Sequence, residues 1–264
     1  MSGILYIVPT PIGNLEDMTL RAIRVLKDVD LVLCENTSVT QRLFKEYSIT
    51  TKTTVFYAQS GIKNIEKIME ALQEGKSLAL VSDAGTPTIS DPGYHLVDAC
   101  ISENIVVEAL PGPNIVSIAL SASGIPSDKF TFSGYLSKTP YDRDQELQDL
   151  RDSGRTAVLF ENKHRLLNLL RNISIVYGQR QIVYVGVELT KMHERHLRGE
   201  ADDLYEQLNQ NSDYKSENVK GEVTVVIAPL SPQWNKDLKV EQPLEPTVNS
   251  MAERDKRAQS IVNA

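Results

Sequence analysis

Ser77–Tyr94 reads SLALVSDAGTPTISDPGY and gives the clearest structural signal in this chain of 264 residues. The stretch opens with an apolar run, Leu78–Val81, which is too short for a helix and has the length of a buried strand. The turn that follows, Asp83–Gly93, is long for a strand-to-helix connection, which usually has about 2–6 residues. Its glycines, prolines and small polar residues let a backbone approach a ligand closely. We interpret this turn as a binding loop, with a plain connection as the alternative.

Two more loops of similar composition follow predicted strands in the first half of the chain. Pro9–Asn14 comes after the β-type run Ile4–Val8, and Pro111–Asn114 comes after Ile105–Leu110. Strands that alternate with helices indicate a parallel sheet with helices on its faces. The carboxyl ends of parallel strands meet at one edge of the sheet, so the three loops are expected to converge there. The usual dinucleotide fingerprint, G-x-G-x-x-G, is absent from the sequence.

The spacing of apolar residues predicts eight helices and several short strands. The helices are expected over Thr19–Lys27, Thr37–Tyr47, Ile62–Gln73, Gly93–Ser102, Ile115–Ser123, Asp142–Asp152, His164–Ile175 and Asp202–Asn209. Asp17 is the predicted N-cap of the first helix. The remaining strands are expected over Leu31–Cys34, Thr54–Tyr57, Lys129–Tyr135, Thr156–Glu161, Gln181–Val187, Glu194–Gly199 and Glu222–Ala228.

The strand and helix pattern changes near residue 127, which predicts two domains. Residues 1–126 are expected to form a parallel α/β domain, and residues 127–229 a mixed α/β domain with some antiparallel pairing. Residues 230–264 contain Pro232, Pro243 and Pro246 and no apolar run, so we expect a mostly disordered tail.

Charge and composition narrow the classes of function. The net charge is −7, so any contact with nucleic acid must use a local basic patch rather than the whole molecule. No apolar stretch reaches the roughly 18 residues that a membrane span needs, and the N-terminus lacks the basic leader of a signal peptide. Cys34 and Cys100 have no disulfide or metal-site spacing, and both sit in apolar runs. These features predict a cytoplasmic, metal-free protein with buried thiols.

The chain resembles the ribosomal RNA small subunit methyltransferase I family in an ordered set of runs: LYIVPTPIGNL, ALVSDAGTPTISDPGYHLV, ALPGPN, ALSASGIPSDKF, ENKHRLL, ELTK and VKGEV. The resemblance covers about Gly3–Ala228. It implies two α/β domains of the tetrapyrrole-methylase type, with S-adenosylmethionine in the cleft between them. It also implies methylation of a cytidine ribose 2′-hydroxyl in the 16S ribosomal RNA of the small ribosomal subunit, and a homodimer.

The same resemblance, together with the loops described above, predicts the cofactor site. Tight turns are expected to offer backbone donors and acceptors, two isoleucines to pack on the adenine or ribose, and the second domain to add further contacts. These residues are, in that order, Pro11, Ala84, Gly85, Thr86 and Asn114; Ile89 and Ile115; and Phe160, Glu161, Leu189 and Gly221. For Ile89, Ile115 and Leu189 the alternative is simple core packing.

Three side chains are candidates for chemistry at the acceptor. A ribose hydroxyl is a weak nucleophile, so a base or a charge stabiliser should assist its methylation. Glu35 and Asp83 each follow a predicted strand, and Lys191 is placed to stabilise negative charge. For all three the alternative is a loop cap or a surface ion pair. No Ser-His-Asp or Cys-His arrangement is visible in the sequence.

Two basic clusters in the second half are candidates for contacts with RNA phosphates. The first holds Lys163, His164, Arg165 and Arg171, and the second holds Lys191, His193, Arg195, His196 and Arg198. For the first cluster the alternative is a solvated helix face. The second cluster has so many basic residues close together that we favour contact with RNA.

The sequence departs from the family pattern in two runs that follow first-domain strands. Members usually carry Glu-Asp-Thr-Arg-His-Thr where this chain has Glu35–Thr40, and His-acid-His-Asn where it has Tyr57–Ser60. The departures fall at Asn36, Ser38, Val39, Tyr57 and Gln59, while the cofactor loops are intact. Two further hypotheses therefore stay open: a divergent methyltransferase of the superfamily with another acceptor, and a non-catalytic RNA- or ribosome-binding relative.

Overall fold

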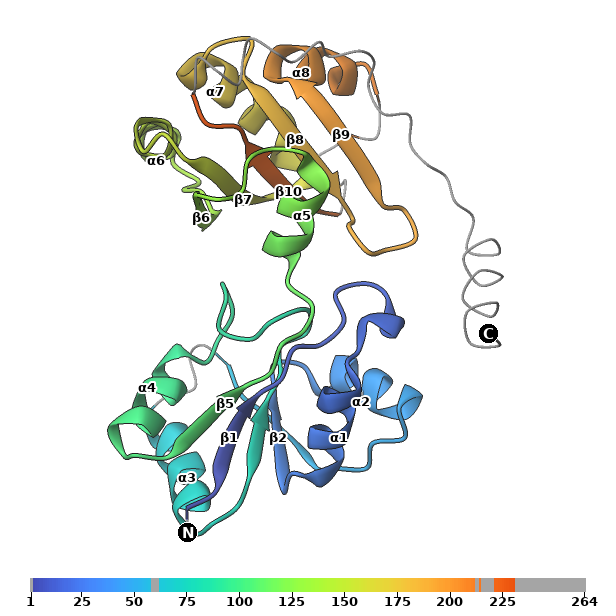
Figure 1. Cartoon of the computed structure of the whole chain (residues 1–264), viewed down its shortest axis with the longest axis vertical. Helices are drawn as coiled ribbons and strands as arrows, with labels where there is room; N and C mark the ends of the chain where they lie inside the picture. Colours follow the sequence, from blue (N-terminus) through green and yellow to red (C-terminus); the bar gives the residue numbers. More distant parts are fainter. Residues whose placement is uncertain (1, 58–61, 212–213, 215–220, 231–264) are drawn as a thin grey trace. The chain divides into compact units, whose positions relative to one another are not determined.

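The computed structural model describes residues 2–57, 62–211, 214 and 221–230 (Figure 1). The chain forms two compact units, Met1–Ile115 and Val116–Ala264, and each unit has its own five-stranded sheet. The predicted domain boundary at residues 126/127 lies beyond the end of the first unit and stays a prediction. From residue 231 onwards, the predicted tail lies outside the described residues.

The first unit is built on a parallel sheet with the strand order β3-β2-β4-β1-β5. All of its pairings are parallel, as the alternation of strands and helices predicted. The strands are β1 (Ile4–Ile7), β2 (Leu31–Cys34), β3 (Thr53–Val55), β4 (Leu78–Leu80) and β5 (Val106–Ala109). β4, which opens the long loop, is buried along its whole length in the centre of the sheet.

Helices cover both faces of this sheet. α1 (Leu20–Asp28) and α2 (Thr37–Glu46) pack in one apolar cluster, and α3 (Ile62–Gln73) and α4 (Tyr94–Ser102) pack in the other. Both cysteines are buried free thiols, as predicted. Among the described residues, no helix is long and apolar enough to cross a membrane.

The N-terminus of α1 differs from the prediction. Thr19, not Asp17, is the N-cap, and its side chain accepts a hydrogen bond from the backbone N–H of Ala22 at 3.1 Å. Asp17 belongs to a separate short 3-10 helix, Leu15–Asp17, and stands too early in the chain to reach the first turn of α1. The threonine is the better cap because its extended backbone directly precedes the first helical residue.

The second unit has a mixed sheet with the order β6-β7-β10-β8-β9. Only the β6–β7 pair is parallel, which confirms the predicted antiparallel pairing. The strands are β6 (Phe130–Tyr135), β7 (Thr156–Asn162), β8 (Ile182–Val187), β9 (Arg195–Glu200) and β10 (Glu222–Ile227).

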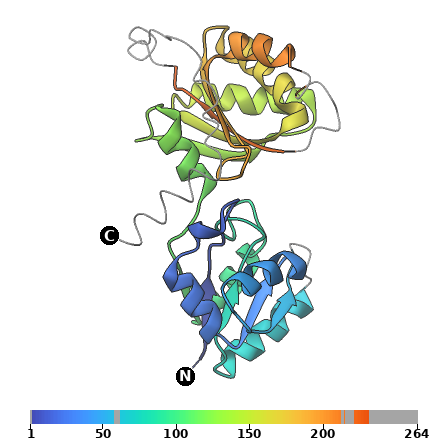
Figure 2. The same cartoon turned by 90° about the vertical axis from the view of Figure 1, so that its right-hand side faces the viewer.

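The helices of the second unit lie on the two sides of its sheet (Figures 1 and 2). One side carries α6 (Pro140–Asp152), α7 (Leu166–Tyr177) and α8 (Ala201–Asn209), whose leucines join the main apolar cluster of the unit. α5 (Ile115–Ser123) lies on the other side. Before α7, Lys163–Arg165 forms a 3-10 turn.

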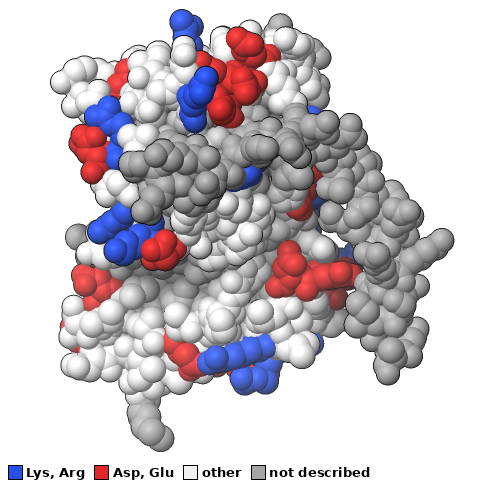
Figure 3. All heavy atoms as spheres, turned by 45° about the horizontal axis from the view of Figure 1, so that its top comes forward, with Lys and Arg blue, Asp and Glu red and all other residues white. Residues whose placement is uncertain are grey.

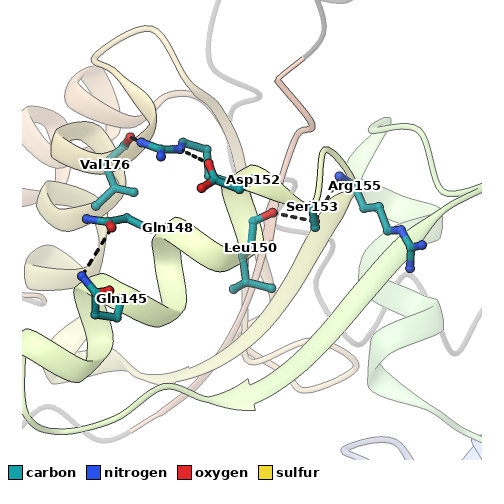
Figure 4. Close-up of polar contacts among 8 residues, drawn as sticks. Gln145, Gln148, Leu150, Asp152, Ser153, Arg155 and Val176 are labelled. Atoms are coloured by element: carbon teal, nitrogen blue, oxygen red, sulfur yellow. Dashed lines mark hydrogen bonds and ion pairs between the residues drawn. The ribbon is translucent and has the colours of Figure 1, made fainter.

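Polar contacts fix the end of α6 against α7 (Figure 4). The guanidinium of Arg151 donates to the carbonyl of Val176 at 3.0 Å and pairs with Asp152 at 2.8 Å. The hydroxyl of Ser153 donates to the carbonyl of Leu150 at 2.6 Å, which ends the helix. The chain can then turn directly into β7.

Gly3, just before β1, packs closely against the backbone of Lys76. A Cβ at this position would lie 1.7 Å from the carbonyl oxygen of Lys76, a backbone atom that cannot rotate away. We expect Gly3→Ala to lower the free energy of unfolding by about 3 kcal/mol or more. Gly124→Ala is the control, because a Cβ at Gly124 meets no atom within 4 Å and adds only the strain of a φ of +62°, about 1–2 kcal/mol. Denaturant unfolding followed by circular dichroism measures both costs, and equal costs would contradict the close approach.

Candidate active site

The three predicted loops meet at the carboxyl edge of the first sheet. Thr10 and Gly85 exchange two backbone hydrogen bonds, of 2.9 and 3.0 Å, which join the loop after β1 to the loop after β4. The hydroxyl of Thr10 donates to the carbonyl of Ser82 at 3.1 Å. The hydroxyl of Thr86 donates to the carbonyl of Pro113 at 2.8 Å, which adds the loop after β5. The predicted convergence of the loops is therefore confirmed.

Glycines make these close approaches possible. Gly85 has a φ of +79°, a conformation that favours glycine, although a Cβ there would be only in ordinary contact with Ile12, at 3.6 Å, and with the carbonyl of Pro113, at 3.7 Å. A Cβ at Gly112 would stand 2.6 Å from Cβ of Pro9, so only glycine lets these two loops touch. The small residues of the loops thus serve the contacts between the loops as well as any ligand.

Three carboxylates lie together beside the loops. Burial, followed by the charges of Asp91 and Asp83, raises the pKa of Glu35. Burial also raises the pKa of Asp83, against a hydrogen bond from the backbone of Asn36. Burial and the charge of Asp83 raise the pKa of Asp91, against a hydrogen bond from Ser82. A carboxylate with a raised pKa is a better proton acceptor near neutral pH.

Asp91 was not among the predicted site residues. The sequence did contain a signal for it, since Asp83 and Asp91 bracket the long turn. Two non-glycine residues of the turn, Thr88 and Ser90, have positive φ values of 72° and 61°. These conformations fold the turn back, so that Asp91 lies near the end of β4.

A pocket of about 220 Å³ opens within the first unit beside these carboxylates. Its walls come from the loop after β1, from α2 and from the start of the long loop. They consist of Thr10, Pro11, Ile12, Gly13, Leu15, Val39, Thr40, Arg42, Leu43, Ser82 and Asp83. The sequence did not point to Arg42 and Leu43 as residues of the site. Which side of α2 faces the loops depends on how the helix packs, and the local sequence does not determine that.

The other first-unit cofactor candidates lie on or next to the joined loops. Ala84 is exposed, and Ile89 is 43% exposed, so core packing does not account for this isoleucine. Asn114 and Ile115 are half-buried at the start of α5. Their position agrees with the predicted cofactor edge, and their contact with a ligand stays a prediction.

The second-unit candidates gather at one end of the second sheet. Phe160 and Glu161 lie near the end of β7, Leu189 follows β8, and Gly221 precedes β10. Because β10 runs antiparallel to both β7 and β8, its start lies beside their ends. The ring of Phe160 packs edge-on against Phe132, with 4.8 Å between the ring centroids.

Two of these residues are held by the packing of their own unit. Leu189 is 4% exposed, and its side chain stands 2.6 Å from where a Cβ of Gly186 would lie, which fits the core-packing alternative. Glu161 is 2% exposed, accepts a hydrogen bond from the backbone of Asn162 at 2.8 Å and pairs with Arg165 at 3.5 Å. Burial raises the pKa of Glu161, against that hydrogen bond and the charge of Arg165.

Lys191 is engaged in ion pairs. Its ammonium lies 2.8 Å from Glu222 and 3.3 Å from Glu188. Burial alone would lower the pKa of Lys191, but the hydrogen bonds and charges of these two glutamates raise it overall. Lys191 thus fits the ion-pair alternative. It lies in the second unit, whereas Glu35 and Asp83 lie in the first.

Part of the second basic cluster is also committed to internal contacts. His196 lies 2.6 Å from the hydroxyl of Tyr184 through Nδ1 and 2.6 Å from Glu194 through Nε2. Arg195 and Arg198 are half-buried on β9. Whether these arginines reach RNA stays a prediction.

The first basic cluster is similarly divided between internal and exposed groups. The ammonium of Lys163 lies over the ring of Tyr214, 4.7 Å from its centroid. Arg171, and His193 of the second cluster, are exposed. In the view of Figure 3, basic and acidic groups are interspersed over the described surface. Within the described residues, no group of His, Cys, Asp and Glu is arranged to hold a metal ion.

Comparison with known proteins first shows the class of protein to which this fold belongs. The family model for Tetrapyrrole (Corrin/Porphyrin) Methylases matches residues 4–205. A cobalt precorrin-4 methyltransferase has the same fold, with a TM-score of 0.62 and 18% identity over 89% of this chain and 96% of that chain. Diphthine synthase has a TM-score of 0.63 and 13% identity over 86% of this chain and 90% of that chain. The chain thus has the predicted tetrapyrrole-methylase fold.

Two curated relatives then give the family. Ribosomal RNA small subunit methyltransferase I of Thermotoga maritima is 41% identical over 226 residues, which are 86% of this chain and 98% of that protein. The protein of the same name from Escherichia coli O157:H7 is 44% identical over 192 residues, 73% of this chain and 67% of that protein. The chain belongs to the ribosomal RNA small subunit methyltransferase I family, which confirms the resemblance seen in the sequence.

The raised pKa of Asp91 predicts how stability depends on pH. The pKa of the Asp91 carboxyl is higher in the folded protein than its ordinary value of 3.8. The folded protein therefore loses stability as the pH rises above that value, because the carboxyl ionises less readily in the folded state than in the unfolded state. We expect Asp91→Asn to raise the melting temperature at pH 7 by roughly 2–4 °C per kcal/mol recovered. This gain should shrink towards pH 3.

Glu74→Gln is the control for this effect. A hydrogen bond from Lys76 and the charge of Lys76 lower the pKa of Glu74, so its removal should bring no gain at pH 7. Thermal unfolding between pH 3 and 7 makes the comparison. A lower melting temperature of the Asp91→Asn protein at pH 7 would show that the Asp91 carboxylate stabilises the loop.

Proposed function

We propose that this protein is an S-adenosylmethionine-dependent methyltransferase of the cytoplasm that methylates a cytidine ribose 2′-hydroxyl of 16S ribosomal RNA in the small subunit. The observation that carries the proposal is the 41% identity to the Thermotoga protein over 98% of its length. The joined loops and the carboxylates beside them support it. Formation of a homodimer belongs to the same proposal, and light scattering tests it.

The residues at the loop edge suit S-adenosylmethionine. Gly85, with its positive φ, is bonded to Thr10 through both of its backbone groups, so the ligand contacts proposed for this turn fall to the exposed Ala84 and to Thr86 beside it. Ile89 offers an exposed apolar side chain for the adenine. The carboxylates of Asp83 and Asp91 suit a cationic ligand, because an opposite charge offsets their mutual repulsion.

For this reaction the protein must position the ribose hydroxyl and accept its proton. S-adenosylmethionine supplies a methyl group that its sulfonium already activates. As the new oxygen–carbon bond forms and the sulfur–carbon bond breaks, the ribose hydroxyl must lose a proton. Glu35 and Asp83 are the proposed acceptors, since both have raised pKa values at the loop edge. Holding the acceptor in line supplies much of the remaining rate.

Contacts to RNA are proposed for Lys163, Arg165, Arg195 and Arg198 in the second unit. Arg165 already pairs with Glu161 at 3.5 Å, so it would bring a partly neutralised charge to a phosphate. Lysines and arginines that neutralise phosphates give RNA binding its dependence on salt concentration. We therefore assign these four residues to positioning of the RNA rather than to chemistry.

Thr86 offers a test of the cofactor site. We expect Thr86→Trp to weaken S-adenosylmethionine binding by about 100-fold or more, a loss of about 2.8 kcal/mol, because the indole fills the space between the loops. Ile175→Trp, at a site 73% exposed on α7, is the control and should bind normally. Isothermal calorimetry measures both affinities. The absence of binding heat with the folded, unmutated protein would refute the cofactor assignment.

The departures from the family pattern favour either slow methylation of the family's usual substrate or an acceptor site changed to suit another one. Val39 lies in the wall of the pocket beside Asp83, where the family pattern has a histidine. Asn36 caps α2 by accepting a hydrogen bond from the backbone of Ser38 at 3.0 Å, and an aspartate would keep that cap. Tyr57 is 58% exposed after β3, and Gln59 lies outside the described residues.

Restoring the family residues together tests this interpretation. We expect the variant with Asn36→Asp, Ser38→Arg, Val39→His, Tyr57→His and Gln59→His to methylate small subunits faster, on the order of 10²-fold if two charge-assisted contacts return. The changes are made jointly because residues of one site act as a unit. Single-turnover methylation of unmodified small subunits is the measurement. If the unmutated protein already matches an ordinary family member, these side chains are not needed for catalysis.

A further inference from the structure

The pocket in the first unit is not explained by the predicted cofactor residues. Of those residues, only Pro11 lies in its walls. The walls are largely apolar between a basic and an acidic side chain, Arg42 and Asp83. At about 220 Å³ the pocket lies below the roughly 300–1,000 Å³ typical of sites for drug-sized ligands. This volume suits a single nucleoside rather than a longer segment.

Arg42 is the uncommitted cation of this pocket. It lies on α2, is exposed, and has no hydrogen bond or ion pair within the part of the chain that the structure describes. It is not paired with Asp83, although both line the pocket, so the two charges stand apart on the wall. An arginine in this state can take a phosphate oxygen without breaking an internal contact.

The acidic side of the pocket is the carboxylate group described above. Asp83 lies in the wall, and the charges of Asp83 and Asp91 act on Glu35 nearby. A carboxylate accepts a hydrogen bond from a sugar hydroxyl, and it repels a phosphate. The arrangement therefore sets a direction for a bound nucleotide, with phosphate towards Arg42 and sugar hydroxyl towards Asp83.

We propose that this pocket receives one unstacked nucleotide of the RNA substrate. The base lies between apolar walls that include Val39 and Leu43, a phosphate pairs with Arg42, and the ribose hydroxyl faces Asp83. Enzymes that do chemistry on a base take it out of the stack and hold it between aromatic or apolar side chains, and the same hold on a base fixes the position of its ribose. The inference rests on the proposed function and adds to it the position of the acceptor.

Two variants test the walls and the cation separately. Val39→Trp fills the pocket, and we expect it to lower kcat/KM for small subunits by about 100-fold. Arg42→Ala removes the phosphate contact and should lower kcat/KM by about 10- to 100-fold. It should also reduce the slope of log kcat/KM against log salt by about 0.7–0.9, as expected for the loss of one phosphate contact. Calorimetry should show an unchanged affinity for S-adenosylmethionine in both variants.

Lys45→Ala is the matched control. Lys45 is an exposed cation on α2, three residues beyond Arg42, and it does not line the pocket. The Lys45→Ala protein should keep both the rate and the salt slope of the unmutated protein. Equal effects of Arg42→Ala and Lys45→Ala would show that only the overall charge of the helix matters, and would overturn the proposal.

A binding measurement gives a readout that does not depend on activity. Cytidine 3′-monophosphate is titrated into methyl-labelled protein, and the resonances of Val39 and Leu43 are followed by NMR. We expect these methyl groups to shift with the nucleotide and to shift much less with inorganic phosphate. Shifts of the same methyl groups with S-adenosylmethionine alone would assign the pocket to the cofactor, and would overturn the proposal.

The outcomes separate this inference from the proposed function. If the unmutated protein transfers no methyl group to small subunits, the proposed function fails. If it does transfer methyl groups and the Val39→Trp protein is equally fast, the enzyme assignment stands and the nucleotide pocket is wrong. Loss of rate in the Val39→Trp and Arg42→Ala proteins, with normal cofactor affinity and with pocket shifts from the nucleotide, supports both.

Discussion

The paired backbone hydrogen bonds between Thr10 and Gly85 are the contact on which the site depends. They are possible because β1 and β4 are neighbours in a parallel sheet, so the loops that leave their ends run side by side. The Thr10 hydroxyl on Ser82 and the Thr86 hydroxyl on Pro113 extend this join to the third loop. The loop edge is therefore held by backbone geometry, which tolerates little change in its glycines.

The carboxylates at this edge work against the stability of the fold. Burial disfavours the ionised form of Glu35 most, and the like charges of Asp91 and Asp83 add to the effect. Such a cluster is retained when a site needs groups with shifted pKa values, although charges in purely structural networks shift too. The adjacent pocket, with Asp83 in its wall, is the geometric reason to assign this cluster to function.

Parts of this arrangement follow from the sequence and parts do not. The bounds of α3 and α5 and the convergence of the loops were predicted correctly, because apolar periodicity and parallel topology are local or simple rules. The rotation of α2, which brings Arg42 to the pocket, depends on how Leu43 and Phe44 pack in the core. One partner of Lys191, Glu188, stands three residues before it, but the other, Glu222, comes from β10, which is remote in the chain, so no local pattern reveals that pair.

The position of Arg42 bears on the departures from the family pattern. Residues four apart lie on the same face of an α-helix, so Arg42 stands one turn beyond Ser38, where the family pattern has an arginine. Arg42 thus provides a cation on this face of α2, about 6 Å along the helix from position 38 at a rise of about 1.5 Å per residue. Val39 meanwhile places an apolar side chain in the wall where the pattern has a histidine. On the proposed function, this face of α2 holds the acceptor nucleotide through Arg42 in place of the arginine missing at position 38, and the base lies against a more apolar wall.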